Sequence, residues 1–194
     1  IKLALTCGEE TTTAFNGAGW LAKNRRELID AEYALNEGGG GLVGPDGTRS
    51  VLSMQVGEKT VANFRLETTN PGGHSSMPRP DNAIYSLATA LNRVGRYEFP
   101  VQFSDTTRSF FSRLAPTLPP KMSGAVTALL ANQEDKAADA LVSMDPTLHS
   151  TLRTTCVATM LDGGHAMNAL PQRARAIVNC RIFPGVPTAD ILGE

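Results

Sequence analysis

The sequence has few cysteines and no long apolar run. Its cysteines are Cys7, Cys156 and Cys180, an odd number without a CxxC pair. A disulfide framework or a cysteine-rich zinc site is therefore not expected, and all three are predicted to be small buried apolar residues. No apolar run approaches the roughly 20 residues of a membrane-spanning helix. The sequence thus contains no candidate membrane segment.

An excess of charge of either sign is also missing. The chain carries 18 basic and 19 acidic residues, for a net charge of −1, and only 6% of its residues are aromatic. Nucleic-acid-binding surfaces are normally basic and often aromatic, so no nucleic acid is expected as a partner. The hydrophobic fraction of 41% is ordinary for a globular protein, and 194 residues suffice to bury a core without covalent staples.

The two ends of the chain resemble cuts. The first residue is Ile1 rather than methionine, and the last, Glu194, falls inside a predicted helix. We therefore expect a fragment of a longer protein, with any targeting segment outside it. The cellular compartment is left unknown.

A division near residue 57 separates two predicted domains. Residues 1–57 alternate between strand and helix patterns, which indicates part of an α/β domain with a largely parallel sheet. Functional groups in such sheets gather at the carboxyl ends of strands. The expected elements are strands at 1–5, 33–35 and 51–56 and a helix at 17–26.

Residues 58–194 are predicted to form an α+β domain. Alternating apolar residues predict strands around 62–66, 155–160 and 174–182. Asp81 is expected to cap a long amphipathic helix, and Thr188 to cap a final one. Helices broken by prolines are expected at about 105–150. One more strand would complete a ferredoxin-like βαββαβ unit, so the last strand is expected to be missing.

Three carboxylates follow predicted strands of the first domain. Glu9 and Glu10 are adjacent, and neighbouring residues in an extended chain point in opposite directions. One can therefore bind a metal while the other faces a substrate as a general base. Glu37 precedes a run of glycines that allows close backbone approach. A solvated acidic pair and a flexible glycine loop are the simpler alternatives.

Polar residues of the second domain provide further candidates. His74 lies in a glycine-rich loop between a strand and a helix, a setting that favours function over a structural role. Asn168 precedes a proline turn and is equally consistent with turn capping. Arg181 lies on a strand's polar face, where it is either solvated or able to hold a carboxylate. His149 and His165 are predicted to be non-catalytic.

Together, these segments resemble the M20 family of zinc metallopeptidases. The resemblance rests on Cys7-Gly8-Glu9-Glu10, Ala34-Leu35-Asn36-Glu37-Gly38-Gly39, Pro71-Gly72-Gly73-His74-Ser75-Ser76-Met77-Pro78, Asn168-Ala169-Leu170-Pro171 and Val178-Asn179-Cys180-Arg181-Ile182-Phe183-Pro184-Gly185. Their order and spacing agree with the family. The His-Ser-Ser-Met-Pro run and Leu152-Arg153-Thr154-Thr155 resemble its carboxypeptidase S and N-acyl-amino-acid hydrolase branch.

This resemblance implies a role for each candidate. Glu9 matches the general base that activates the attacking water. Glu10 and Glu37 match terminal ligands of two zinc ions. His74 matches a lid histidine that reaches the partner subunit's active site. Two further matches, Asn168 and Arg181, are lid residues that hold the substrate.

The resemblance also implies the assembly and the reaction. Residues 1–57 would be part of the catalytic domain, and residues 58–194 the lid that forms a homodimer. The substrate would be a peptide or an N-acyl amino acid, cleaved at its amide bond. The family's upstream His-x-Asp and downstream His are not found in this chain, so we expect the fragment by itself to be inactive. The alternatives are an isolated non-catalytic dimerisation and substrate-binding module, or an ordinary ferredoxin-like binding domain.

Overall fold

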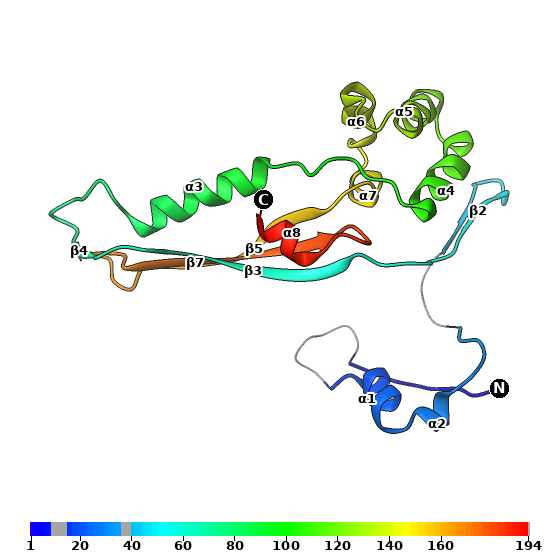
Figure 1. Ribbon diagram of the computed structural model, residues 1–194, viewed down its shortest axis with the longest axis horizontal. Coiled ribbons are helices and arrows are strands. Elements are labelled where there is room, and N and C mark those ends of the chain that lie inside the picture. The colour runs from blue at the N-terminus through cyan, green and yellow to red at the C-terminus, as the bar shows by residue number, and fades with distance from the viewer. Residues whose placement is uncertain (9–14, 36–39, 194) are drawn as a thin grey trace. The chain divides into compact units, whose positions relative to one another are not determined.

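The computed structural model describes residues 1–8, 15–35 and 40–193, which form two compact units. The first comprises Ile1–Gly41 with Leu52–Met54, and the second comprises Leu42–Val51 with Gln55–Glu194. Helices and sheets are both present, which confirms the mixed α/β class (Figure 1). The domain boundary at residue 57 stays a prediction. No helix in the described ranges is both long and apolar enough to cross a membrane.

The first unit contains two short helices. Helix α1 (Gly17–Asn24) is capped by Asn16, whose side chain accepts a hydrogen bond from the backbone N–H of Gly19 at 2.7 Å. Helix α2 (Arg26–Ile29) follows directly. The predicted strands at 1–5 and 33–35 are wrong. An apolar strand is stable when layers cover it, whereas the side chains of Ile1, Leu3 and Leu5 are exposed.

A two-stranded sheet and a three-stranded sheet follow. Strands β1 (Gly40–Val43) and β2 (Arg49–Ser53) are joined by a turn in which Gly47 has a φ of 82°. The larger sheet has the order β3-β7-β5, with both pairs antiparallel. Its strands are β3 (Thr60–Thr69), β5 (Thr155–Gly163) and the central β7 (Arg173–Ile182).

One face of this sheet is covered by helices. Alternate residues of β7 are buried: Ala174, Ala176, Val178, Cys180 and Ile182. Helix α3 (Ala83–Arg96) packs Ala83 and Leu87 on the first two, and Ile191 of α8 (Thr188–Gly193) packs against the others. The opposite face carries polar side chains of β3 and β7, among them Asn63, Glu67 and Arg175, beside the apolar Val61, Val157 and Met160.

The predicted cap of α3 is off by one residue. The side chain of Asn82 accepts hydrogen bonds from the backbone N–H groups of Ile84 and Tyr85, at 2.9 and 3.4 Å. Asp81 instead pairs with Arg79 at 2.9 Å. Both residue types are good caps, so their order alone did not distinguish them.

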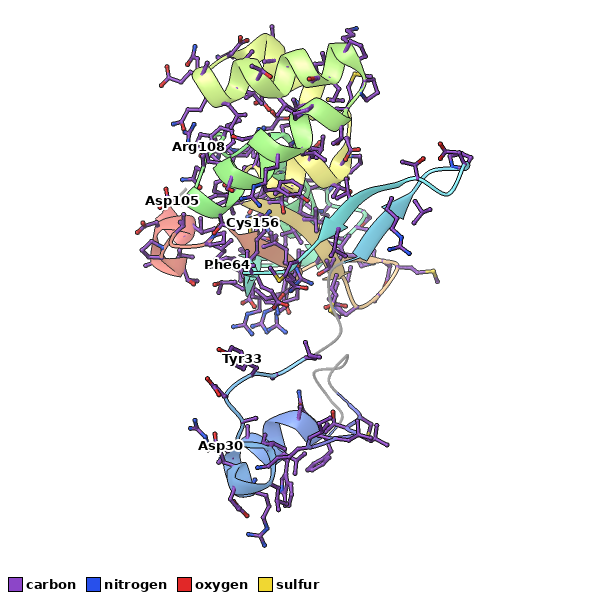
Figure 2. The ribbon with its side chains drawn as sticks, turned by 90° about the vertical axis from the view of Figure 1, so that its right-hand side faces the viewer. Asp30, Tyr33, Phe64, Asp105, Arg108 and Cys156 are labelled. Carbon is purple, nitrogen blue, oxygen red and sulfur yellow. A yellow bond between two sulfur atoms is a disulfide. The ribbon has the colours of Figure 1, made fainter. Side chains whose placement is uncertain are left out.

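The region between α3 and β5 is a helical insert with a core of its own, as expected. It contains α4 (Asp105–Leu114), the 3-10 helix η1 (Ala115–Thr117), α5 (Pro120–Ala131), α6 (Lys136–Val142) and α7 (Pro146–Thr151). Phe111, Val126 and Leu129 are 1% exposed and pack together in this core. In Figure 2, Asp105 and Arg108 mark α4, and Arg108 lies 4.8 Å over the ring of Phe103.

Cys156 and Cys180 form a disulfide, contrary to the prediction for the cysteines. They are direct partners in the β5–β7 ladder, with Cα atoms 4.1 Å apart (Figure 2 labels Cys156). The sequence did not predict this pairing of two cysteines that are 24 residues apart, because the pairing depends on strand register. Cys7 is exposed rather than buried.

A polar network joins the sheet to the insert. Arg153 is 1% exposed and bonds Asp139, and its Nη1 donates to the carbonyl of Phe99 at 3.3 Å. Ser143 Oγ donates to Asp139 at 2.9 Å and lies 2.9 Å from Nδ1 of His149. Asp139 thus contacts the serine rather than the histidine. This arrangement is not that of a catalytic triad.

Lys59 places a buried charge in this region. Its Nζ is buried, and no described residue forms a hydrogen bond with it. Burial, together with Arg153 and Arg181, lowers the pKa of Lys59 to about 8. Burial, and then Arg153, also holds the pKa of His149 below its usual value.

The disulfide predicts a thiol count. The denatured, unreduced chain should expose one reactive thiol, that of Cys7, and a reduced chain all three cysteines. Replacing Cys156 and Cys180 by serine should lower the free energy of unfolding by about 3 kcal/mol, because the denatured chain gains conformational entropy when the disulfide no longer closes a loop. Denaturant unfolding with and without reductant measures this. A double variant that still responds to reductant would contradict the assignment.

Lys59 predicts a pH dependence of stability. Between pH 8 and 10.5 the folded chain has released the Lys59 proton while the unfolded chain retains it. The unfolded state then binds more protons, so stability rises with pH across this window. After allowance for solvent screening at this half-buried site, the rise should be about 1–2 kcal/mol.

The matching variant isolates this contribution. Lys59→Met should be more stable than the wild type at pH 7. Its free energy of unfolding should not show the rise between pH 8 and 10.5 that Lys59 contributes. Lys121→Met, at an exposed position of α5, is the control and should keep the slope. Equal slopes in all three chains, measured by denaturant unfolding from pH 7 to 10.5, would refute the assignment.

Candidate functional site

His74 and Asn168 lie together at one tip of the second unit. Strand β4 (Gly73–His74) pairs with β6 (Ala169–Leu170), with His74 opposite Ala169. The backbone N–H of Ser75 donates to the carbonyl of Asn168 at 2.9 Å. Two segments distant in sequence therefore form one small ladder that positions both predicted residues.

Glycine residues make this tip possible. Gly72 and Gly73 have φ angles of 80° and 147°, in the left-handed region that favours glycine. A Cβ on Gly72 would lie 2.6 Å from Cγ of Gln172. The side chain of Asn70 accepts a hydrogen bond from the Gly72 N–H at 2.9 Å, which closes the turn. The chain is thus bent sharply just before His74.

The ring of His74 is exposed and oriented by its own loop. The backbone N–H of Ser76 donates to Nδ1 of His74 at 3.2 Å, and Ser76 Oγ lies 2.8 Å from the same atom. An Nδ1 that accepts a hydrogen bond leaves Nε2 as the N–H donor of the neutral ring. His74 therefore presents a donor suited to an oxygen that gains negative charge.

Arg181 lies at the other end of the sheet. It is opposite Val61 on β3 and Thr155 on β5. From Arg173, at the tip end of β7, to Arg181 is eight steps along the strand. At about 3.3 Å per step this amounts to roughly 26 Å. One chain therefore brings His74 and Asn168 together but keeps Arg181 apart from them.

The predicted metal and base residues cannot be placed. Glu9, Glu10 and Glu37 lie outside the described residues. In the described ranges, no group of three or more histidine, cysteine, aspartate or glutamate side chains is arranged to hold a metal. Two carboxylates are fewer than the roughly three protein ligands of a catalytic zinc site. The zinc site therefore stays a prediction from the sequence.

The free edge of β5 is apolar. Val157, Met160 and Leu161 are 59%, 66% and 71% exposed. Ile84 and Tyr85 of α3, the helix that packs beside β5, are also exposed. An exposed apolar edge strand is a template for pairing with another chain. The sequence predicts an open sheet with an unpaired edge but does not identify β5 as an edge strand, because alternation does not reveal which strand is outermost.

A cavity of about 570 Å³ lies on the covered face of the sheet, where α3 and α8 pack. Phe64, Val94, Phe99, Val178 and Leu192 belong to its mainly apolar lining. None of the predicted functional residues lines it, so it is not part of the candidate site.

Residues 56–194 match the family model of the peptidase dimerisation domain of M20 peptidases. This range includes the whole β3-β7-β5 sheet, the tip with His74 and the apolar edge of β5.

Several relatives match nearly the whole chain. A probable carboxypeptidase S-like protein of Dictyostelium discoideum is 31% identical over 91% of this chain and 34% of its own length. The Homo sapiens N-fatty-acyl-amino acid synthase/hydrolase PM20D1 is 28% identical over 84% of this chain and 33% of its own length. Carboxypeptidase S of Saccharomyces cerevisiae is 26% identical over 94% of this chain and 33% of its own length.

The chain thus spans about a third of the length of these relatives. The family match covers well over half of the chain and coincides with the unit that carries the tip and the free edge. The chain belongs to the M20 peptidase family, of which it contains the dimerisation domain.

Proposed function

We propose that the chain is part of a two-zinc hydrolase that cleaves the amide bond of peptides or N-acyl amino acids. The observation that carries the proposal is the family match over residues 56–194. Relatives named as carboxypeptidases and as N-fatty-acyl-amino acid hydrolases support both substrate classes. Hydrolysis of such amides by the whole protein, measured directly, tests it.

In this proposal each candidate has one task. Glu10 and Glu37 would be ligands of the two zinc ions, and other parts of the whole protein would complete the set. Bound zinc would acidify the attacking water and polarise the substrate carbonyl. Glu9 would take the proton from the water and deliver it to the leaving amine. His74 would donate from Nε2 to the oxygen that becomes negative, and Asn168 would hold the substrate beside it.

A homodimer would combine the separated groups. Arg181 lies roughly 26 Å along β7 from Arg173, the end of the strand that is nearer to the His74 and Asn168 ladder. A substrate of a few residues does not span that distance. The tip of one subunit and Arg181 of the other would therefore act at one site. The apolar edge of β5 supplies the contact for a two-fold pair.

The alternative is that this chain by itself is a non-catalytic module. It would dimerise and bind substrate without hydrolysing it, because its zinc ligands are incomplete. The ferredoxin-like description is part of the same proposal. The order β3-β7-β5 leaves an edge at β3 where a strand following α8 would complete the βαββαβ unit.

The dimer contact predicts an effect of charge on the edge. Val157→Lys on β5 should raise the dissociation constant of the dimer at least about tenfold, because an edge lysine opposes strand pairing. Val61→Lys on β3 is the matched control, since Val61 is similarly exposed, at 49%, but lies on the opposite edge strand. Light scattering across a concentration series measures both. If Val61→Lys dissociates the dimer and Val157→Lys does not, the interface lies at β3 and the assignment to β5 is wrong.

The two adjacent carboxylates predict different failures in the whole protein. Glu9→Gln should keep metal and substrate affinity while kcat falls about 100-fold or more, because an amide does not accept the proton. Glu10→Gln should lose zinc affinity, measured by elemental analysis, because a neutral amide is a poorer ligand. Full activity in Glu9→Gln would reject the mechanism.

Mixed dimers test the role of His74 across subunits. His74→Ala should lower kcat with zinc content unchanged. Heterodimers of Glu9→Gln with His74→Ala should recover part of the activity, because one of their two sites has both groups intact. Verified heterodimers without recovery would place His74 in the site of its own subunit.

A further inference from the structure

The layer between α3 and the sheet opens toward the C-terminal end of the helix. Near the start of α3, Ala83 and Leu87 are 1% exposed and pack tightly on β7. Two turns further along, Val94 is only half-buried, although it packs against the core around Val178. The cavity of about 570 Å³ lies at this wider end.

The floor and walls of the cavity are apolar. Phe64 of β3 and Cys156 of β5, both labelled in Figure 2, belong to its lining, and so does Val178 of β7 between them. Phe99 and Leu192 of α8 add to the walls. Small-molecule sites have volumes of about 300–1,000 Å³ and mostly apolar linings. An apolar cavity holds water poorly, so an apolar group is the occupant that fits it.

Two arginines of α3 are the charged residues of the described lining. Arg93 and Arg96 are both exposed. Arginine commonly lays its alkyl stem on apolar surface and keeps its guanidinium in water, which places both charges at the open side of the cavity. Neither side chain forms an ion pair or a hydrogen bond with another described residue. The described part of the lining contains no carboxylate.

These two arginines differ from others in the same unit. Arg173 and Arg175 share the carboxylate of Glu67, at 3.5 and 2.6 Å. Arg93 and Arg96 lie in the last turn of α3, where positive charge complements the helix dipole. That role does not require an apolar cavity beside them. An apolar interior next to two unpaired cations is complementary to a molecule with an alkyl chain and an anionic head.

We infer that this cavity binds an amphipathic anion with a single alkyl chain, of which a fatty acid is the simplest example. The chain would lie against Phe64 and Val178, and Arg93 and Arg96 would hold the anionic head through charge-assisted hydrogen bonds. The wall formed by α3 extends from Ala90 over seven residues, or about 10 Å. A chain that covers this wall removes apolar surface from water, which is favourable in proportion to the area covered.

The inference goes beyond the proposed function and does not depend on it. His74, Asn168 and Arg181 do not line the cavity, and the binding requires neither zinc nor hydrolysis. It is therefore testable on the 194-residue chain itself. A whole protein that hydrolyses no amide would reject only the proposed function, and a cavity that binds no amphipathic anion would reject only this inference.

The first test is displacement of a fluorescent fatty acid, dansyl-labelled undecanoate, from the wild-type chain, with every ligand below its micelle concentration. Dodecanoate and dodecyl phosphate should displace it, whereas butyrate should not, because its chain is too short to cover the apolar wall. Dodecanol has the same chain without the charge and should bind at least about tenfold more weakly. Dodecanol that binds as tightly as dodecanoate, or butyrate that displaces the probe equally well, overturns the inference.

The two charged ligands distinguish the source of the head group. Tighter binding of dodecanoate identifies a fatty-acid site, and tighter binding of dodecyl phosphate identifies a site for a phosphate-bearing lipid. Both results support an amphipathic anion as the occupant.

Methyl NMR of the wild-type chain locates the bound ligand. Dodecanoate should shift the methyl signals of Val94, Val178 and Leu192, which line the cavity. The signals of Val157 and Met160, which are exposed on β5, should stay unchanged. Shifts confined to Val157 and Met160 would place the ligand on the free edge of the sheet and overturn the inference. This measurement needs no variant, so it decides the question even if a variant fails to fold.

Variants test the role of the arginines. Replacing both Arg93 and Arg96 by methionine should weaken dodecanoate binding about tenfold and leave dodecanol binding unchanged, because only the charged head loses its partners. Arg113→Met, at an exposed position of α4, is the matched control and should bind both ligands as the wild type does. Unchanged dodecanoate affinity in a folded double variant would overturn the inference.

Discussion

The pairing of β7 with both of its neighbours is the constraint on which the rest of the second unit depends. Its antiparallel register with β3 extends over the whole length of both strands, from Thr60 opposite Ile182 to Thr69 opposite Arg173. The register with β5 places Cys156 against Cys180. Shifting either register by one residue would turn the buried face of β7 to solvent. The ladder thus fixes the core, the disulfide and the position of every polar residue on the open face.

That ladder separates two regions with different chemistry. At one end, glycines and a short second ladder hold His74 and Asn168 on an exposed tip. At the other end, Arg181 lies near Lys59, whose Nζ has no hydrogen-bond partner in the part of the chain that the structure describes. A rigid sheet between them keeps the two regions apart, so a site that needs both requires a second subunit. Dimerisation and substrate binding are then two aspects of one geometry.

Much of the second unit was predictable from sequence, because it depends on local patterns. Alternation revealed β3, β5 and β7, and helical spacing revealed α3. The disulfide was missed because register is not local. The strand predicted at 1–5 failed because an apolar run forms a strand only when other layers cover it. The positions of His74 and Asn168 followed from their motifs, whereas the cationic cluster around Lys59 depends on three segments that meet only in the fold.

The helical insert has its own hydrophobic core, separate from the two clusters that line the sheet. It is attached at its base by a hydrogen bond from the Gln102 N–H to the carbonyl of Leu152 and by the contacts of Arg153. Units with separate cores exchange their amide hydrogens as separate cooperative units. The insert is thus able to open and close while the ladder stays intact. Each opening would release Arg153 from Asp139, which makes the insert a source of fluctuation at the cationic end of the sheet and leaves the distant tip undisturbed.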